Sequence, residues 1–386
     1  MKSRQTWERI LSFPGNLFYF PIEMVFKGVE RTTEYLDESK LVYKIFDKLT
    51  TDDGLRGVRP YYSSRAGGGI KLFQKNLLNE NSKLTLTLAA GLRERRRYEL
   101  RLKRVQFPGQ NILSDYKIRY QFLSDESFYG IGKESQRSGR SNYAHEQIVI
   151  TSSFEKHLNR IWSVNALIGF EENEIQRGRD IEYPSTTDLY ADEKLSGLST
   201  KNRMGKVQFT FEADARNHRG QPTAGYRLFF GSALYQQVDD KAFGFWKFSA
   251  DFSKFVHLFY NRTIVLRVAG EVTEPFRTRE IPFYHLAELG SRETIRGFRR
   301  GRFRDEDMIL GSLEYRYPVW FHTDIALFVD AGHVTEDIFR EITPRDVQVG
   351  YGIGIRLLGG EDIITKFEIS NSREQLRVYF ELNPDL

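Results

Sequence analysis

Long and short connections alternate in a fixed order along this chain, and that order restricts the fold more than any other feature. From about residue 57, apolar and polar residues alternate, which is the period of a β-strand with one apolar face. For example, Tyr116, Ile118 and Tyr120 are separated by Lys117 and Arg119. The pattern predicts sixteen strands, near residues 57–64, 67–77, 81–92, 97–107, 114–124, 143–155, 159–172, 203–214, 222–235, 242–256, 261–273, 308–318, 322–333, 347–358, 362–371 and 375–383.

The long connections all follow odd-numbered strands. Segments 125–142, 173–202, 274–307 and 334–346 follow strands five, seven, eleven and thirteen, whereas most even strands are followed by short turns. A soluble sandwich also alternates, but it has no reason to sort its loops by parity. An outer-membrane barrel has short periplasmic turns and long outer loops. We therefore expect an all-β protein whose residues 57–386 form a sixteen-stranded antiparallel transmembrane β-barrel, integral to a bacterial outer membrane.

The composition agrees with a barrel that contacts the lipid bilayer. Charged residues make up 28% and aromatic residues 14% of the chain, which suits apolar side chains facing lipid and polar ones facing a wet lumen. No apolar run approaches the roughly 18 residues of a spanning helix. The net charge of +5 is spread without a stacking motif, so we expect no nucleic-acid partner. The absence of Cys excludes disulfides and thiolate metal sites.

Residues 1–56 differ from the rest. Pro14, Gly15 and Pro21 interrupt an aromatic stretch, and a more charged helical pattern runs from Glu30 to Leu49. We expect a short amphipathic helical segment on the periplasmic side, at the membrane interface or packed on the barrel mouth, where a separate periplasmic subunit has a place to dock. An ordinary packing helix fits the pattern as well. No signal peptide is recognisable, so we expect a mature or trimmed chain.

The first and last strands predict a weak seam. Proline donates no hydrogen bond, so Pro60 belongs at a strand edge. Gly67, Gly68 and Gly69 follow, and the last strand carries Phe380 in an alternating row. Because a barrel closes by pairing its first strand with its last, these residues suggest a poorly paired seam.

The longest outer loop carries the most specific motif. Segments Ile281–Tyr284, Leu289–Gly290, Thr294–Phe298 and Glu314–Arg316 resemble the surface-antigen barrel of the BamA/TamA superfamily, whose sixth outer loop has a [VI]-R-G-[FY] tip. Phe128–Gly132 also resembles a segment common in these barrels. The resemblance implies that loop 274–307 folds into the lumen.

Strand parity supplies partners for the loop arginine. Leu313 and Val329 belong to lipid-facing rows, so Glu314 and Asp330 point inward. The resemblance implies that Arg296 pairs with these two acids, and one guanidinium can serve two carboxylates. Gly297 would allow a tight turn, and Phe298 would wedge against the wall. We call Arg296, Gly297, Phe298, Glu314 and Asp330 the loop lock. Charge alone favours a solvated loop, because Arg299, Arg300, Arg302 and Arg304 surround the motif.

The resemblance implies a function in protein assembly or translocation, with client outer-membrane proteins engaged at the weak seam. The βαββα POTRA repeats of such factors have no counterpart before residue 57, so the chain resembles a short, POTRA-less branch. A passive channel or structural barrel without insertase activity is the alternative. A third possible function is the handling of lipid or surface polymer.

Catalytic motifs are weak, and we expect no enzyme, cofactor or metal. Gly350–Gly354 echoes a nucleotide loop, but it lies within an alternating strand, where small inward residues would leave room for the loop. The segment His145–Glu146 lacks a second His at metal-ligand spacing. A lumenal Ser/His hydrolase would need a pair at a defined spacing, which the sequence does not offer.

Overall fold

The computed structural model describes residues 49–63, 65–107, 109–190, 195–198, 201–320, 323–341, 343, 346–359 and 362–382. The helical segment predicted before residue 57 lies outside the described residues up to position 48. Among the described residues, no helix is long and apolar enough to cross a membrane.

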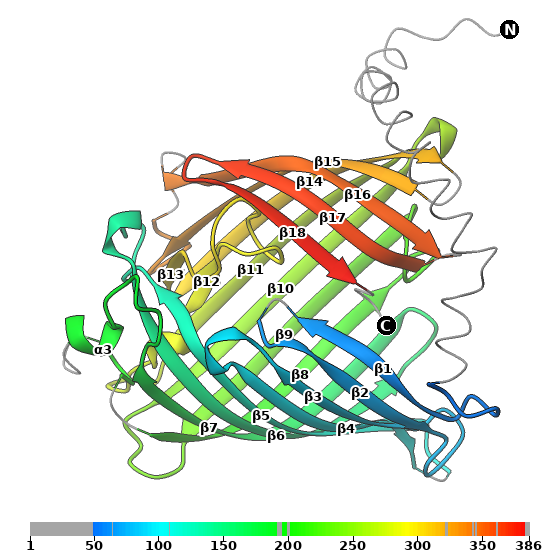
Figure 1. The fold of residues 1–386 in the computed structure, drawn as a ribbon, viewed down its shortest axis with the longest axis horizontal. Coiled ribbons are helices and arrows are strands. Elements are labelled where there is room, and N and C mark those ends of the chain that lie inside the picture. The colour runs from blue at the N-terminus through cyan, green and yellow to red at the C-terminus, as the bar shows by residue number, and fades with distance from the viewer. Residues whose placement is uncertain are drawn as a thin grey trace, which may run out of the picture.

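A single antiparallel sheet of sixteen strands curls into a nearly closed barrel (Figure 1). The predicted fold class, strand number and strand order are confirmed. The barrel strands are β1 Arg56–Ser63, β2 Gly67–Lys75, β3 Lys83–Ala90, β4 Arg96–Gln106, β5 Ile112–Phe128, β6 Ser141–His157, β7 Trp162–Arg177, β8 Asn202–Asp214, β9 Gly225–Gln237, β10 Gly244–His257, β11 Thr263–Pro275, β14 Asp307–Trp320, β15 Thr323–Thr335, β16 Gln348–Gly359, β17 Asp362–Ser372 and β18 Leu376–Leu382.

The two ends of the barrel differ as predicted. One end, which we call the long-loop end, carries connections 129–140, 178–201, 276–306 and 336–347. The other, the short-turn end, carries turns such as 107–111 and 258–262. Strands β5, β6 and β7 are longer than alternation predicted. Their added residues at the long-loop end include buried polar side chains such as Glu126, Asn142 and Asn173, which interrupt the apolar row.

The outer and inner faces follow the period of two. Side chains on the outer face remain exposed in the isolated chain although they are apolar, for example Leu313, Val329 and Phe380 at 43%, 39% and 51%. Such a continuous apolar surface is what a bilayer covers. Buried side chains with charge, such as Glu314 and Asp330, lie on the inner face.

The sheet ends at β1 and β18. Within the described strands, β1 pairs only with β2 and β18 pairs only with β17. Figure 1 shows these two strands, blue and red, as the separate margins of the sheet. We call this junction the seam.

Candidate functional site: the lumen loop and the seam

Residues 276–306, between β11 and β14, form the lumen loop, two residues shorter at its start and one at its end than the predicted 274–307. A short hairpin of β12 (Ala287–Leu289) and β13 (Phe303–Asp305) narrows the loop, and the tip between these strands carries the predicted motif. Ile295 and Phe298 at the tip are fully buried, packed with Leu289, Phe303 and Leu310. This apolar packing holds the tip inside the barrel.

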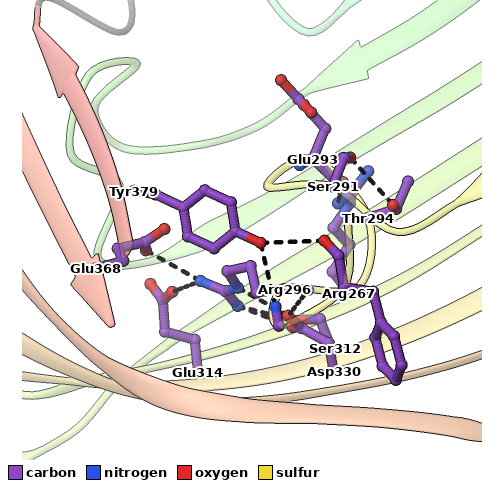
Figure 2. Close-up of polar contacts among 12 residues, drawn as sticks. Arg267, Ser291, Glu293, Thr294, Arg296, Ser312, Glu314, Asp330, Glu368 and Tyr379 are labelled. Carbon is purple, nitrogen blue, oxygen red and sulfur yellow. Dashed lines mark hydrogen bonds and ion pairs between the residues drawn. The ribbon is translucent and has the colours of Figure 1, made fainter. Parts of the chain in front are cut away.

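Arg296 lies among carboxylates on the inner wall (Figure 2). Its Nε and Nη2 donate to the two oxygens of Asp330 at 2.7 and 2.8 Å, which is a bidentate contact. Its Nη1 donates to Glu314 at 3.3 Å and to Glu368 at 3.1 Å. The guanidinium also lies 3.4 Å from the ring centre of Phe328. Arg296 is 8% exposed and Asp330 1% exposed, so water screens these contacts weakly.

Two further arginines balance the acids. Arg356 donates to Glu314 at 2.7 Å and to Glu368 at 3.1 Å, and Arg316 donates to Glu314 at 2.7 Å. Three guanidinium groups therefore meet three carboxylates, and the formal charge of the group is zero. We call this group the Arg296 cluster: Arg296, Glu314, Arg316, Asp330, Arg356 and Glu368. The pairing of opposite charges offsets the cost of burying this ionic group.

Two glycines let the loop backbone approach the wall. Gly297 has a φ of +96°, and a Cβ there would lie 2.8 Å from the Asn371 carbonyl oxygen. A Cβ on Gly350 of β16 would lie 1.8 Å from the carbonyl oxygen of Arg296. A side chain at either position therefore requires backbone to move. Gly350 therefore leaves room for the loop, as expected for the small inward residues of Gly350–Gly354.

The loop tip also contacts the last strand. Tyr379 of β18 accepts a hydrogen bond from the Gly297 N–H at 3.2 Å and donates to the Phe298 carbonyl at 3.3 Å. Arg292 forms an ion pair with Glu381 of β18 at 2.8 Å. The tip that reaches β14 and β15 therefore supports one side of the seam from within.

The stem of the lumen loop is anchored to the opposite wall. His285 Nε2 lies 2.6 Å from Glu171 of β7, and Lys247 of β10 donates to the His285 carbonyl at 2.6 Å. Phe283 is fully buried against Phe128 and Tyr143. The loop therefore crosses the lumen and joins two sides of the barrel.

A cluster of acids lies where the loop enters β14. The pKa of Glu306 is raised to about 7. Burial is the main cause, and the negative charges of the neighbouring acids add to it: Glu336, Asp305, Asp307 and Glu274. Burial likewise raises the pKa of Asp305 to about 6. The root of the loop is thus sensitive to pH near neutrality.

The predicted seam residues lie on β1, β2 and β18. Leu55 accepts a hydrogen bond from Lys75 N–H, which directs the backbone groups of odd β1 residues toward β2. The backbone groups of even β1 residues, including Pro60 and Tyr62, therefore point toward the seam. Proline removes one donor from that edge. Gly67 begins β2 with a φ of +89°, Gly68 pairs with Tyr62, and Phe380 faces outward.

A short hairpin covers part of the β1 edge. Val58 N–H donates to the Leu49 carbonyl at 2.8 Å, and Thr51 N–H donates to the Arg56 carbonyl at 2.9 Å. Asp53 closes the turn by accepting from Leu55 N–H at 2.9 Å, and Gly54 has a φ of +65°. We call Leu49–Thr51 the edge cap. It lies at the short-turn end and leaves Tyr62 beyond its reach.

The structure brings Arg296 together with both acids chosen by parity, and it adds partners that the sequence analysis missed. The apolar–polar alternation of β16 and β17 also directs Arg356 and Glu368 inward, so their inward position was predictable from the sequence. Tyr379, His285 and Glu171 depend on the path of the loop, which parity does not give. Among the described residues, no group of three or more His, Asp and Glu side chains could hold a metal ion.

The fold and this loop define an outer-membrane β-barrel whose lumen is crossed by a long loop. Residues 76–360 match the Omp85 superfamily domain. The chain belongs to the Omp85 superfamily, to which the resemblance in the sequence pointed.

Solved structures of low sequence identity share the fold. BamA from Haemophilus ducreyi lacking POTRA domains 1–3 aligns with a TM-score of 0.60 and 16% identity, over 85% of this chain and 69% of that one. CdiB from Acinetobacter baumannii aligns with a TM-score of 0.51 and 13% identity, over 85% of this chain and 56% of that one. CdiB from Escherichia coli aligns with a TM-score of 0.51 and 12% identity, over 83% of this chain and 60% of that one. The chain thus spans little more than half of each CdiB. No curated protein matches the chain.

Proposed function

We propose that this barrel assembles or translocates client outer-membrane proteins in a bacterial outer membrane by pairing their β-strands with the open edge of β1 or β18. The observation that carries the proposal is the seam, where, among the described strands, β1 pairs only with β2 and β18 only with β17, and the edge cap covers only part of β1. An unpaired strand edge in lipid must find donors and acceptors, and a client strand supplies them.

The two margins of the seam suit different steps. Pro60 reduces the number of donors on β1, so any strand paired there is held by fewer bonds and can leave. The lumen loop supports β18 through the contact of Gly297 with Tyr379 and the ion pair of Arg292 with Glu381, which keeps that margin in place while the seam opens. In this arrangement the short-turn end faces the periplasm, and clients and any separate periplasmic subunit arrive there.

A seam disulfide tests the proposal. The chain has no Cys, so one cysteine at Tyr62, beyond the edge cap, and one at Leu376, at the same end of β18, can be introduced without background thiols. Client barrels are then folded into vesicles that contain the oxidised or the reduced double variant. Assembly activity predicts loss of client insertion after oxidation and recovery after reduction. A passive channel predicts steady conductance and no effect of the disulfide on client folding, and that result would overturn the proposal.

A further inference from the structure

The inner wall beside the seam carries a large excess of positive charge. On β1–β4 and on β5 up to Gln121, the inward-facing row contains nine cations and two acids, so the net charge is 9 − 2 = +7. We call this set the basic wall. Its cations are Arg59, Lys71, Lys75, Lys83, Arg97, Arg101, Lys103, Lys117 and Arg119, and its acids are Glu99 and Asp115. Further toward the long-loop end, Arg65 pairs one to one with Glu126 at 2.9 Å and leaves this balance unchanged.

The cations of the basic wall oppose one another across neighbouring strands. Lys83 stands directly opposite Lys75 on one side and Lys103 on the other. Arg101 stands opposite Lys117. Like charges in direct register destabilise a sheet. Arg59 likewise stands opposite Lys71, so four such pairs on one face lower the stability of the empty barrel, and an anion between them would remove that cost.

The two acids are already occupied. Glu99 pairs with Arg97 at 2.7 Å, and Asp115 pairs with Arg101 at 3.0 Å. Phe73 in the middle of the wall is approached by three cations: Arg59 at 4.9 Å, Lys83 at 5.6 Å and Lys75 at 5.8 Å. An aromatic ring stabilises cations only in part. The wall therefore offers a positive surface to whatever enters the lumen from the seam.

We infer that the basic wall selects client strands whose lumen-facing residues are acidic, an inference that rests on the proposed edge pairing. A client strand paired with β1 continues the sheet, so its inward residues lie next to Arg59 and then Lys71. The inward positions of β1 and of a strand paired with it recur every second residue, about 6.8 Å apart. An extended acidic peptide repeats at the same interval, which favours a polypeptide over a compact anion.

Peptide binding to the full chain in vesicles tests the inference. Two fluorescent peptides share one alternating apolar row and carry either Glu or Lys at the intervening positions. Their binding is compared for the wild type, a wall variant and a control. The wall variant is K71E/K83E/K103E, which changes the wall from +7 to 7 − 6 = +1. The control, R177E/R219E/R340E, makes the same charge change at side chains that are 77%, 76% and 85% exposed.

The expected result is about tenfold tighter binding of the Glu peptide than the Lys peptide, in the wild type and in the control but not in the wall variant. Equal binding of both peptides to the wild type would overturn the acidic selection and leave the edge pairing standing. The same preference in the wall variant would show that the wall does not cause it. Failure of both peptides to bind would overturn the edge pairing itself.

Discussion

The hydroxyl of Tyr379 donates a hydrogen bond to the carbonyl of Phe298 at 3.3 Å, and so connects the last strand of the barrel with the tip of the lumen loop. Tyr379 also accepts from the N–H of Gly297, the residue that follows Arg296, and Arg296 itself contacts β14, β15 and β17 (Figure 2). A change in the Arg296 cluster therefore reaches the seam through one side chain. This relationship links the stability of the barrel with its proposed function.

Arg296→Ala is expected to destabilise the barrel by about 3–5 kcal/mol, because it leaves Asp330, Glu314 and Glu368 buried with too little positive charge. Unfolding in urea, read from tryptophan fluorescence in detergent, measures the loss. Arg300→Ala is the control, since Arg300 lies on the same tip but its side chain is 38% exposed. Equal stability of the two variants would refute the loop lock.

Gly350→Ala is expected to displace the loop tip, because the new Cβ would lie 1.8 Å from the Arg296 carbonyl oxygen. The variant should lose heat resistance in gel electrophoresis and expose the loop to protease. Gly311→Ala on the neighbouring β14 should behave as wild type, since its Cβ would meet nothing closer than 4.0 Å. A protected loop in the Gly350 variant would show that the tip does not rest on β16.

The root of the lumen loop is expected to weaken as the pH rises. Burial and neighbouring acids raise the pKa of Glu306 from 4.5 to about 7 in the folded state, so between these values the folded chain binds more protons than the unfolded one. The resulting destabilisation is absent below pH 4.5, grows through this window and is complete above pH 7. Glu306→Gln should therefore gain stability over wild type at about pH 8 more than at about pH 5. Glu134→Gln, at an exposed position, should show no such difference in urea unfolding.

Asp53→Ala is expected to release the edge cap, because Asp53 closes the turn that holds Leu49 against Val58. The amide of Val58 should then exchange faster with deuterium, and strand peptides should bind the β1 edge more tightly. Asp52→Ala, at an exposed neighbouring position, provides the control. Unchanged exchange at Val58 would mean that the hairpin does not depend on this turn.

Much of the fold was predictable because lipid imposes a strict period on each strand. That period directs Glu314 and Asp330 inward as soon as Leu313 and Val329 are assigned to the outer face. It also directs Glu368 inward, but whether Arg296 reaches it depends on the path of the loop and the stagger of the strands. The dipeptide Asp53–Gly54 is typical of a hairpin turn and would have predicted the edge cap. The helical prediction for residues 1–56 did not take it into account. His285 and Glu171 meet across the lumen, which no local pattern indicates.

Residue-resolved amide exchange at the seam tests the central claim most directly. On β18, Ser372 N–H donates to the Gln375 carbonyl, so odd residues pair with β17 and even residues face the seam. The open edge predicts fast exchange at Tyr62, Val378 and Phe380, and slow exchange at Tyr61, Arg377 and Tyr379. Equal protection of the two sets, at the level of central strands such as β9, would show a closed barrel and contradict the account.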